Sequence, residues 1–160
     1  MELRYQARLI WTGAAEGPAQ GTGFSRAWRL EVPGKPAILG SSDPHFGGDG
    51  AAHNPEDLLL AALASCHMLT YLALCAKARI PVLAYDDAPT GQLGRREDGR
   101  TGFLEATLRP RVVIAAGADV ARAEALHETA GRHCFIAASV AFPVRHQPQV
   151  MAAAAPAPAA

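Results

Sequence analysis

The clearest hydrophobic pattern in the chain is a stretch without formal charge that runs from Leu58 to Ala76. It follows Asn54 and Pro55, a residue that caps helices and one that fits the first helical turn. Glu56 and Asp57 come next and complement the positive end of a helix. The pattern predicts a long helix that is apolar nearly all round and therefore lies inside a globular core.

Alternation of apolar and polar residues predicts strands before and after this helix. Residues 2–11 and 24–32 each place apolar side chains at every second position, which is typical of half-buried strands. Residues 13–23, between the two strands, and residues 33–53, before the helix, are rich in glycine and proline and predict loops. The later elements are predicted as strands at 80–85 and 139–146, one strand over 103–108 and 111–115 that Pro110 interrupts, and a hairpin tip at 94–102. Asp119 caps a predicted helix that ends near Arg132 and whose last turn Gly131 weakens. Its apolar stripe consists of Val120, Ala123, Leu126, His127 and Ala130.

The length of 160 residues suits one domain, which we place at residues 1–147, followed by a disordered Ala/Pro-rich tail at 148–160. Lys+Arg and Asp+Glu are equal at 15 each, so the charge does not favour nucleic acid or an anionic membrane as a partner. The N-terminus lacks the basic and apolar regions of a secretory signal, and we expect a cytoplasmic protein. Three cysteines then indicate reactive or buried thiols rather than a disulfide scaffold.

The uncharged stretch also approaches the length of a membrane span. Several alanines reduce its hydrophobicity, and Ser65, His67 and Thr70 interrupt it. Because polar residues make membrane insertion costly, we expect a core helix and no membrane span.

Cys66 lies near the middle of the long helix. Burial among apolar side chains raises the pKa of a thiol, so Cys66 is nucleophilic only if a positive group stabilises its thiolate. The candidates are Arg26, His67 and His133. The alternative is that Cys66 is a small core residue, which is the commoner role of a cysteine in such a helix.

Arg26 is the odd member of an otherwise apolar row of side chains in the second predicted strand. If its side chain points inward, it needs an anionic or carbonyl partner, because an unpaired buried charge is costly. It can then support a thiolate. Alternatively, Arg26 lies at a sheet edge and extends its guanidinium group to solvent.

Helix geometry constrains the other candidates. Cys75 follows Cys66 by about 13 Å along one helix, so the two cannot form a disulfide there, and we expect Cys75 to be a core residue. Any intramolecular disulfide of Cys66 therefore uses Cys134. Glu56 precedes Cys66 by about 15 Å, so either the helix breaks near its start, or Glu56 acts in the site of a partner subunit, or it only complements the helix dipole.

A metal site formed by Cys66, His67, His133 and Cys134 is a weaker alternative. Zinc accepts these ligand types, but adjacent Cys-His pairs point apart on a helix and no CxxC spacing occurs. We therefore expect no metal and no other cofactor.

Two segments together resemble the OsmC/Ohr family, named for osmotically inducible protein C and organic hydroperoxide resistance protein. Residues 54–68, NPEDLLLAALASCHM, resemble its NPE-x-L-x(n)-C signature, and residues 126–144, LHETAGRHCFIAASVAFPV, resemble its second-cysteine segment. Both blocks have the order and separation seen in the family, and the resemblance covers roughly residues 3–147. The chain differs from the better-known branches at His67 and Met68, and in reading HCFI instead of a Cys-Pro motif.

The resemblance implies an α+β fold with antiparallel sheets, a long buried central helix and two intertwined chains in a homodimer. It also implies a thiol peroxidase without metal, haem or flavin. Cys66 is then the peroxidatic thiol, which forms a sulfenic acid, and Cys134 is the resolving thiol, which forms a disulfide with it. By the same resemblance Glu56 and Arg26 hold the thiolate, and a dithiol or lipoyl protein reduces the enzyme.

Two functions follow from these observations. The first is reduction of organic hydroperoxides, which apolar surroundings favour over hydrogen peroxide. The alternative is a protein of the same fold with little peroxidase activity, which binds an apolar ligand or senses redox state.

Overall fold

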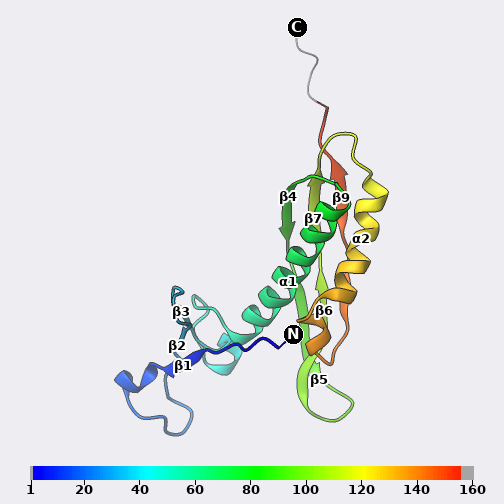
Figure 1. Cartoon of the computed structure of the whole chain (residues 1–160). Helices are drawn as coiled ribbons and strands as arrows, with labels where there is room; N and C mark the ends of the chain where they lie inside the picture. The colour runs from blue at the N-terminus through cyan, green and yellow to red at the C-terminus, as the bar shows by residue number, and fades with distance from the viewer. Residues whose placement is uncertain (1, 156–160) are drawn as a thin grey trace. The chain divides into compact units, whose positions relative to one another are not determined.

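Two α-helices separate runs of consecutive strands along the chain in an α+β arrangement (Figure 1), as the sequence predicts. The computed structural model describes residues 2–155. The contacts within it divide the chain into two units, Met1–Leu59 and Leu60–Ala160. The long helix α1 (Pro55–Lys77) begins in the first unit and continues in the second.

The first unit holds one antiparallel sheet of three short strands in the order β1-β2-β3. The strands are β1 (Arg8–Trp11), β2 (Trp28–Glu31) and β3 (Ile38–Gly40), with Trp11 opposite Trp28 and Trp28 opposite Gly40. A Cβ atom on Gly40 would lie 2.0 Å from the indole of Trp28, so only glycine fits opposite this ring.

Both N-terminal strands are shorter than the alternation predicts. Residues 2–7 are outside β1 because their partner strand ends opposite Arg8, at Glu31, and the chain turns after Val32, whose carbonyl accepts from the Lys35 N–H. Arg26 lies before β2 and not within it. The predicted loop at 33–53 also contains β3, because an alternating pattern of three residues is too short to detect.

The start of α1 is confirmed in detail. The Asn54 side chain accepts from the Asp57 N–H at 2.8 Å, and the Asp57 carboxylate accepts from the Asn54 N–H at 3.3 Å. This reciprocal pair satisfies two donors at the helix end. The helix then continues without a break to Lys77.

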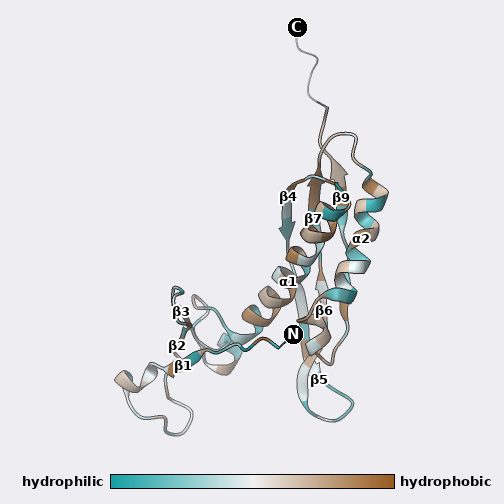
Figure 2. Ribbon diagram, viewed as in Figure 1, coloured by the Kyte–Doolittle hydropathy of each residue, from teal (hydrophilic) through white to brown (hydrophobic). Residues whose placement is uncertain are grey.

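Only one face of α1 is buried within the chain. Four residues at a spacing of four positions are buried, namely Leu63, His67, Tyr71 and Cys75. Leu69, on another face, is 64% exposed, and Figure 2 shows apolar residues along the whole helix. By length and composition α1 could cross a bilayer, as core helices of soluble proteins also could. The prediction of burial nearly all round is therefore wrong for the single chain.

The second unit holds two three-stranded sheets, ordered β4-β7-β9 and β5-β6-β8. In each of these two sheets one pair is antiparallel and the other is parallel, so they are mixed, whereas the sheet of the first unit is antiparallel, as the resemblance implies. The strands are β4 (Val82–Asp87), β5 (Thr90–Arg95), β6 (Thr101–Leu108), β7 (Pro110–Ile114), β8 (Val144–His146) and β9 (Gln149–Ala152).

The predicted interruption at Pro110 separates the two sheets. β6 ends at Leu108. The N–H of Arg109 donates to the side-chain carboxylate of Asp87 at 2.7 Å and not to a backbone carbonyl of a neighbouring strand. Pro110 has no N–H to donate and opens β7. The chain therefore passes from one sheet to the other at this point.

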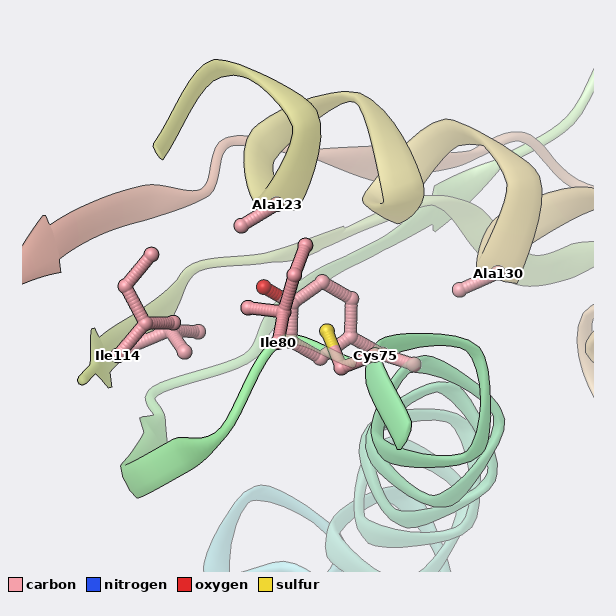
Figure 3. Packing of buried hydrophobic residues seen from close by; sticks show 7 residues of the cluster. Cys75, Ile80, Ile114, Ala123 and Ala130 are labelled. Carbon is pink, nitrogen blue, oxygen red and sulfur yellow. The ribbon is translucent and has the colours of Figure 1, made fainter. Parts of the chain in front are cut away.

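Helix α2 (Val120–His133) covers the core of the second unit, and Asp119 caps it by accepting from the Arg122 N–H at 2.9 Å. Figure 3 shows Ala123 and Ala130 of α2 directed toward Ile80 and Cys75. The buried cluster joins α1, α2 and β7; its members are Tyr71, Cys75, Ile80, Val112, Ile114, Ala123 and Ala130.

The expectation of a disordered tail from residue 148 is wrong for residues 149–152. They form β9, which pairs in parallel with β7, and the Ala153 N–H then donates to the Ile114 carbonyl at 2.8 Å. Val150 packs against the buried cluster. Residues 156–160, the end of the predicted tail, lie outside the described residues.

Candidate active site

The structure brings Cys66 and Cys134 together within the second unit. Cys66 is half-buried in α1, Cys134 follows the last residue of α2 and is 1% exposed, and both are free thiols. The backbone turns sharply at Cys134, whose N–H donates to the Gly131 carbonyl and whose carbonyl accepts from the Ala138 N–H. This turn places the Cys134 side chain within hydrogen-bonding reach of Cys66.

The two thiols differ in acidity. Burial raises the pKa of the Cys66 thiol, but hydrogen bonds from the Cys134 thiol and from the N–H groups of Ile136 and Phe135 outweigh burial and lower it. Burial, together with donation to Cys66, raises the pKa of Cys134. Cys66 is therefore the more acidic thiol of the pair, and Cys134 is the less acidic one.

Replacing Cys134 with alanine should raise the pKa of Cys66, because the replacement removes the first of these hydrogen bonds. Titration of the thiolate by ultraviolet absorbance, together with the pH dependence of alkylation, measures this change. Cys75→Ala is the matched control, since Cys75 contributes no hydrogen bond to Cys66. An unchanged Cys66 pKa in the Cys134 variant would show that the second thiol does not stabilise the first.

The two histidines considered as cations for Cys66 do not serve as such. His67 is fully buried, and its Nε2 lies 3.0 Å from Nδ1 of His127. Burial and the neighbouring histidines lower the pKa of His67 to about 3, so its ring is neutral. His133 is exposed, with Nδ1 at 2.8 Å from the Thr129 carbonyl oxygen.

These positions also bear on the alternative metal site. His67 and His133 point to different neighbours, so they do not form one ligand set with Cys66 and Cys134. Across residues 2–155 no group of three or more His, Cys, Asp or Glu side chains is arranged to hold a metal ion.

Cys75 is buried in the core between α1 and α2 (Figure 3), as expected. Burial raises the pKa of its thiol. The third cysteine is thus an internal reference for the reactivity of the other two.

Arg26 lies in the first unit, in the wall of a cavity of about 670 Å³. Its Nη1 donates to the carbonyls of Thr22 and Phe24, and the guanidinium carbon lies 4.0 Å from the centre of the Phe24 ring. Trp28, Asp49 and His53 line the same cavity. The side chain is therefore half-buried and held by its own loop, and it does not extend freely into solvent as the alternative proposed.

Glu56 lies in the first turn of α1 and is half-buried. Because α1 is continuous from Pro55 to Lys77, the option of a helix break between Glu56 and Cys66 is wrong. Ten residues of helix separate these two side chains by about 15 Å.

Sequence reasoning did not identify two other parts of the site. One is the pair of N–H groups of Phe135 and Ile136, which no side-chain pattern reveals. The other is the burial of His127 and His146 beside His67. The position of His127 in the apolar stripe of α2 was a signal for its burial, but that stripe does not indicate its partners.

Comparison with solved structures gives the same fold. An OsmC-like protein of unknown function from Vibrio cholerae O1 is 32% identical, with a TM-score of 0.87, over 92% of this chain and 100% of that chain. An organic hydroperoxide resistance protein from Elizabethkingia anophelis is 18% identical, with a TM-score of 0.67, over 96% and 100% of the two chains. OhrB of Bacillus subtilis is also 18% identical, with a TM-score of 0.61, over 92% and 98%.

No curated protein sequence matches the chain. The sequence model of the family described as "OsmC-like protein" matches residues 47–148, which include both Cys66 and Cys134. This match covers more than half of the chain and agrees with the resemblance in the two cysteine segments. The chain belongs to the OsmC family.

Proposed function

We propose that this protein is a thiol-dependent peroxidase that reduces organic hydroperoxides, with Cys66 as the peroxidatic and Cys134 as the resolving thiol. One feature carries the proposal: Cys134 lies close enough to Cys66 to lower the pKa of its thiol, while the pKa of Cys134 itself is raised. A nucleophilic thiolate beside a protonated thiol is the arrangement that a two-cysteine peroxidase needs.

The reaction proceeds in two balanced steps. The Cys66 thiolate attacks one peroxide oxygen and the O–O bond breaks, so that Cys66 becomes a sulfenic acid and the alkoxide takes a proton to leave as alcohol. The Cys134 thiol then attacks the Cys66 sulfur, and its proton leaves with the sulfenic hydroxyl as water. A dithiol or a lipoyl protein returns the resulting disulfide to two thiols.

Named relatives support this chemistry at the level of the fold. The structures from Elizabethkingia anophelis and Bacillus subtilis are organic hydroperoxide resistance proteins. At 18% identity they share the fold alone, so the thiol pair itself carries the proposal.

A homodimer belongs to the proposal. Within one chain α1 buries a single face, while Leu69 is 64% exposed, so the remaining apolar surface of the helix is available to a second copy. In such a dimer Arg26 and Glu56 act on the Cys66 thiolate, as the family resemblance implies. Glu56 then acts on Cys66 of the partner subunit and not on Cys66 of its own chain, which lies about 15 Å away along the same helix. The cytoplasm is the proposed location.

The second candidate function is binding of an apolar ligand or redox sensing with little peroxidase turnover, and the cavity beside Arg26 is the place where such a ligand would bind. Leu39 and Trp28 form part of its lining. A ligand-binding protein of this kind would react slowly with peroxides even though its thiols can form a disulfide.

Free-thiol counting during oxidation tests the proposal. Reduced protein mixed with cumene hydroperoxide should lose two of its three thiols rapidly, and more slowly with hydrogen peroxide. The Cys134→Ser variant should lose one thiol and accumulate a sulfenic acid that dimedone traps. Slow oxidation by both peroxides, with no trapped sulfenic acid, would instead favour the second candidate.

A further inference from the structure

Three histidines from three different elements stack in the interior of the second unit. His67 of α1 and His127 of α2 are 0% and 1% exposed, and their ring centres lie 5.3 Å apart. The half-buried His146 of β8 stacks against His67, with ring centres 4.4 Å apart and planes 23° from parallel. None of these side chains belongs to the thiol reaction described above.

The stack is costly as simple packing. Nδ1 of His67 and Nε2 of both His127 and His146 are buried and have no hydrogen-bond partner among the described residues. Each buried polar atom left without a partner loses the hydrogen bonds that water would give it. Aliphatic side chains would fill the same space without this cost. The histidines therefore contribute something beyond volume.

His146 contacts both elements that carry the reactive cysteines. One face of its ring meets His67, the residue directly after Cys66. Its edge meets the backbone of Gly131, where an added Cβ atom would lie 2.5 Å from Cε1 and 3.1 Å from Nε2. Gly131 lies three residues before Cys134, and its carbonyl accepts the hydrogen bond from the Cys134 N–H.

The position of His146 is fixed from a third side. It pairs with Leu108 in the parallel ladder between β8 and β6, and the next N–H, that of Gln147, donates to the Leu108 carbonyl at 2.9 Å. The sequence suggests only that Gly131 weakens the last turn of α2. In the structure a side chain at this position would collide with the His146 ring, so glycine is needed here. The ring of His146 thus contacts α1 at His67 and the last turn of α2 at Gly131.

We propose that His146 is a positioning residue for the reaction between Cys66 and Cys134, because its ring between His67 and Gly131 sets how the Cys134 turn approaches Cys66. The proposal rests on the two-thiol reaction inferred above. It concerns only the second step, in which the Cys66–Cys134 disulfide forms. Peroxide attack on Cys66 does not depend on the ring.

Two substitutions at His146 separate positioning from volume. His146→Phe keeps a flat ring of similar thickness, whereas His146→Leu fills the space without one. We expect His146→Leu to slow disulfide formation from the sulfenic acid about tenfold or more, on the usual sensitivity of reactions to misplacement. His146→Phe should retain a rate within about threefold of the wild type. Sulfenic acid formation should be the same in all three proteins.

A second measurement does not require peroxide. Equilibration with reduced and oxidised dithiothreitol gives the stability of the Cys66–Cys134 disulfide, which should fall about tenfold in His146→Leu and be restored in His146→Phe. A purely structural role would destabilise reduced and oxidised protein alike and would leave this equilibrium unmoved. Unfolding of both redox forms in urea checks this point.

The outcomes distinguish the two proposals. Wild-type disulfide stability and formation rate in folded His146→Leu would overturn the positioning role. A lack of peroxide reaction in the wild type, with the expected change in dithiothreitol, would overturn the peroxidase and leave the positioning role intact. If His146→Leu does not fold, Gly131→Ala, which displaces the ring, provides the same comparison, and His146→Ala with Gly131→Ala should then restore the rate.

Discussion

Replacing Cys66 with serine is expected to reduce the rate of reaction with cumene hydroperoxide by at least about a thousandfold, as loss of a nucleophile does in other enzymes. Serine keeps the size of the side chain, but its hydroxyl is not ionised at neutral pH and cannot attack the O–O bond. Stopped-flow mixing of the reduced protein with the peroxide measures the rate, and the remaining free thiols are counted afterwards.

The other two cysteines provide matched controls. Cys75→Ser should react at close to the wild-type rate if the protein folds, because Cys75 is buried in the core and burial raises its pKa. Cys134→Ser should keep the first step and lose the disulfide. Reaction of Cys66→Ser at the wild-type rate would show that another group reduces the peroxide, and the two-thiol mechanism would then be abandoned.

Local sequence signals predicted the helices well. Asn54 and Asp57 satisfy each other's N–H groups at the start of α1, and at the start of α2 the Asp119 side chain accepts from the Arg122 N–H. Capping depends on residues three positions apart, so it can be recognised without knowledge of the tertiary structure. Helix geometry also excluded a disulfide between Cys66 and Cys75, which left Cys134 as the candidate partner of Cys66.

Strands depended on partners that the sequence does not display. Residues 2–7 alternate as well as β1 does, but β2 has no residues opposite them, so they form no ladder. Residues 149–152 resemble a low-complexity tail, yet β7 offers them an open edge and Val150 packs on the core. Composition cannot reveal either case, since strand pairing is a contact between distant segments.

The support of the Cys66 thiolate was the least predictable part of the site. The sequence favoured a cation, whereas within the second unit the Cys134 thiol and two backbone N–H groups lower the pKa of Cys66. Backbone donors are available at any residue except proline, so only the turn after α2 identifies these two. His67, a candidate cation, is instead a neutral member of the buried histidine stack.

That stack leads to a large expected effect of pH on stability. Burial lowers the pKa of His67 to about 3 and of His127 to about 4, from 6.5 for an exposed histidine. The unfolded chain therefore binds more protons than the folded chain below about pH 6.5. Stability from these residues is complete above that pH, is lost progressively as the pH falls below it, and is fully lost below about pH 3. Asp87 opposes this trend, because burial raises its pKa.

We expect the free energy of unfolding to fall by about 3 kcal/mol between about pH 6.0 and 4.5, since each titrating histidine contributes about 1.4 kcal/mol per pH unit. Urea unfolding at a series of pH values measures the slope.

The control is the double variant His67→Phe with His127→Phe, which removes both members of the hydrogen-bonded pair and leaves no orphaned partner. Its slope in this range should be clearly shallower, because the acidic residues that remain are the same. Equal slopes in the two proteins would mean that the histidines stay protonated, or stay accessible, in the folded chain. The conclusion that His67 and His127 are neutral in the folded chain would then be wrong, while the proposed thiol chemistry would be unaffected.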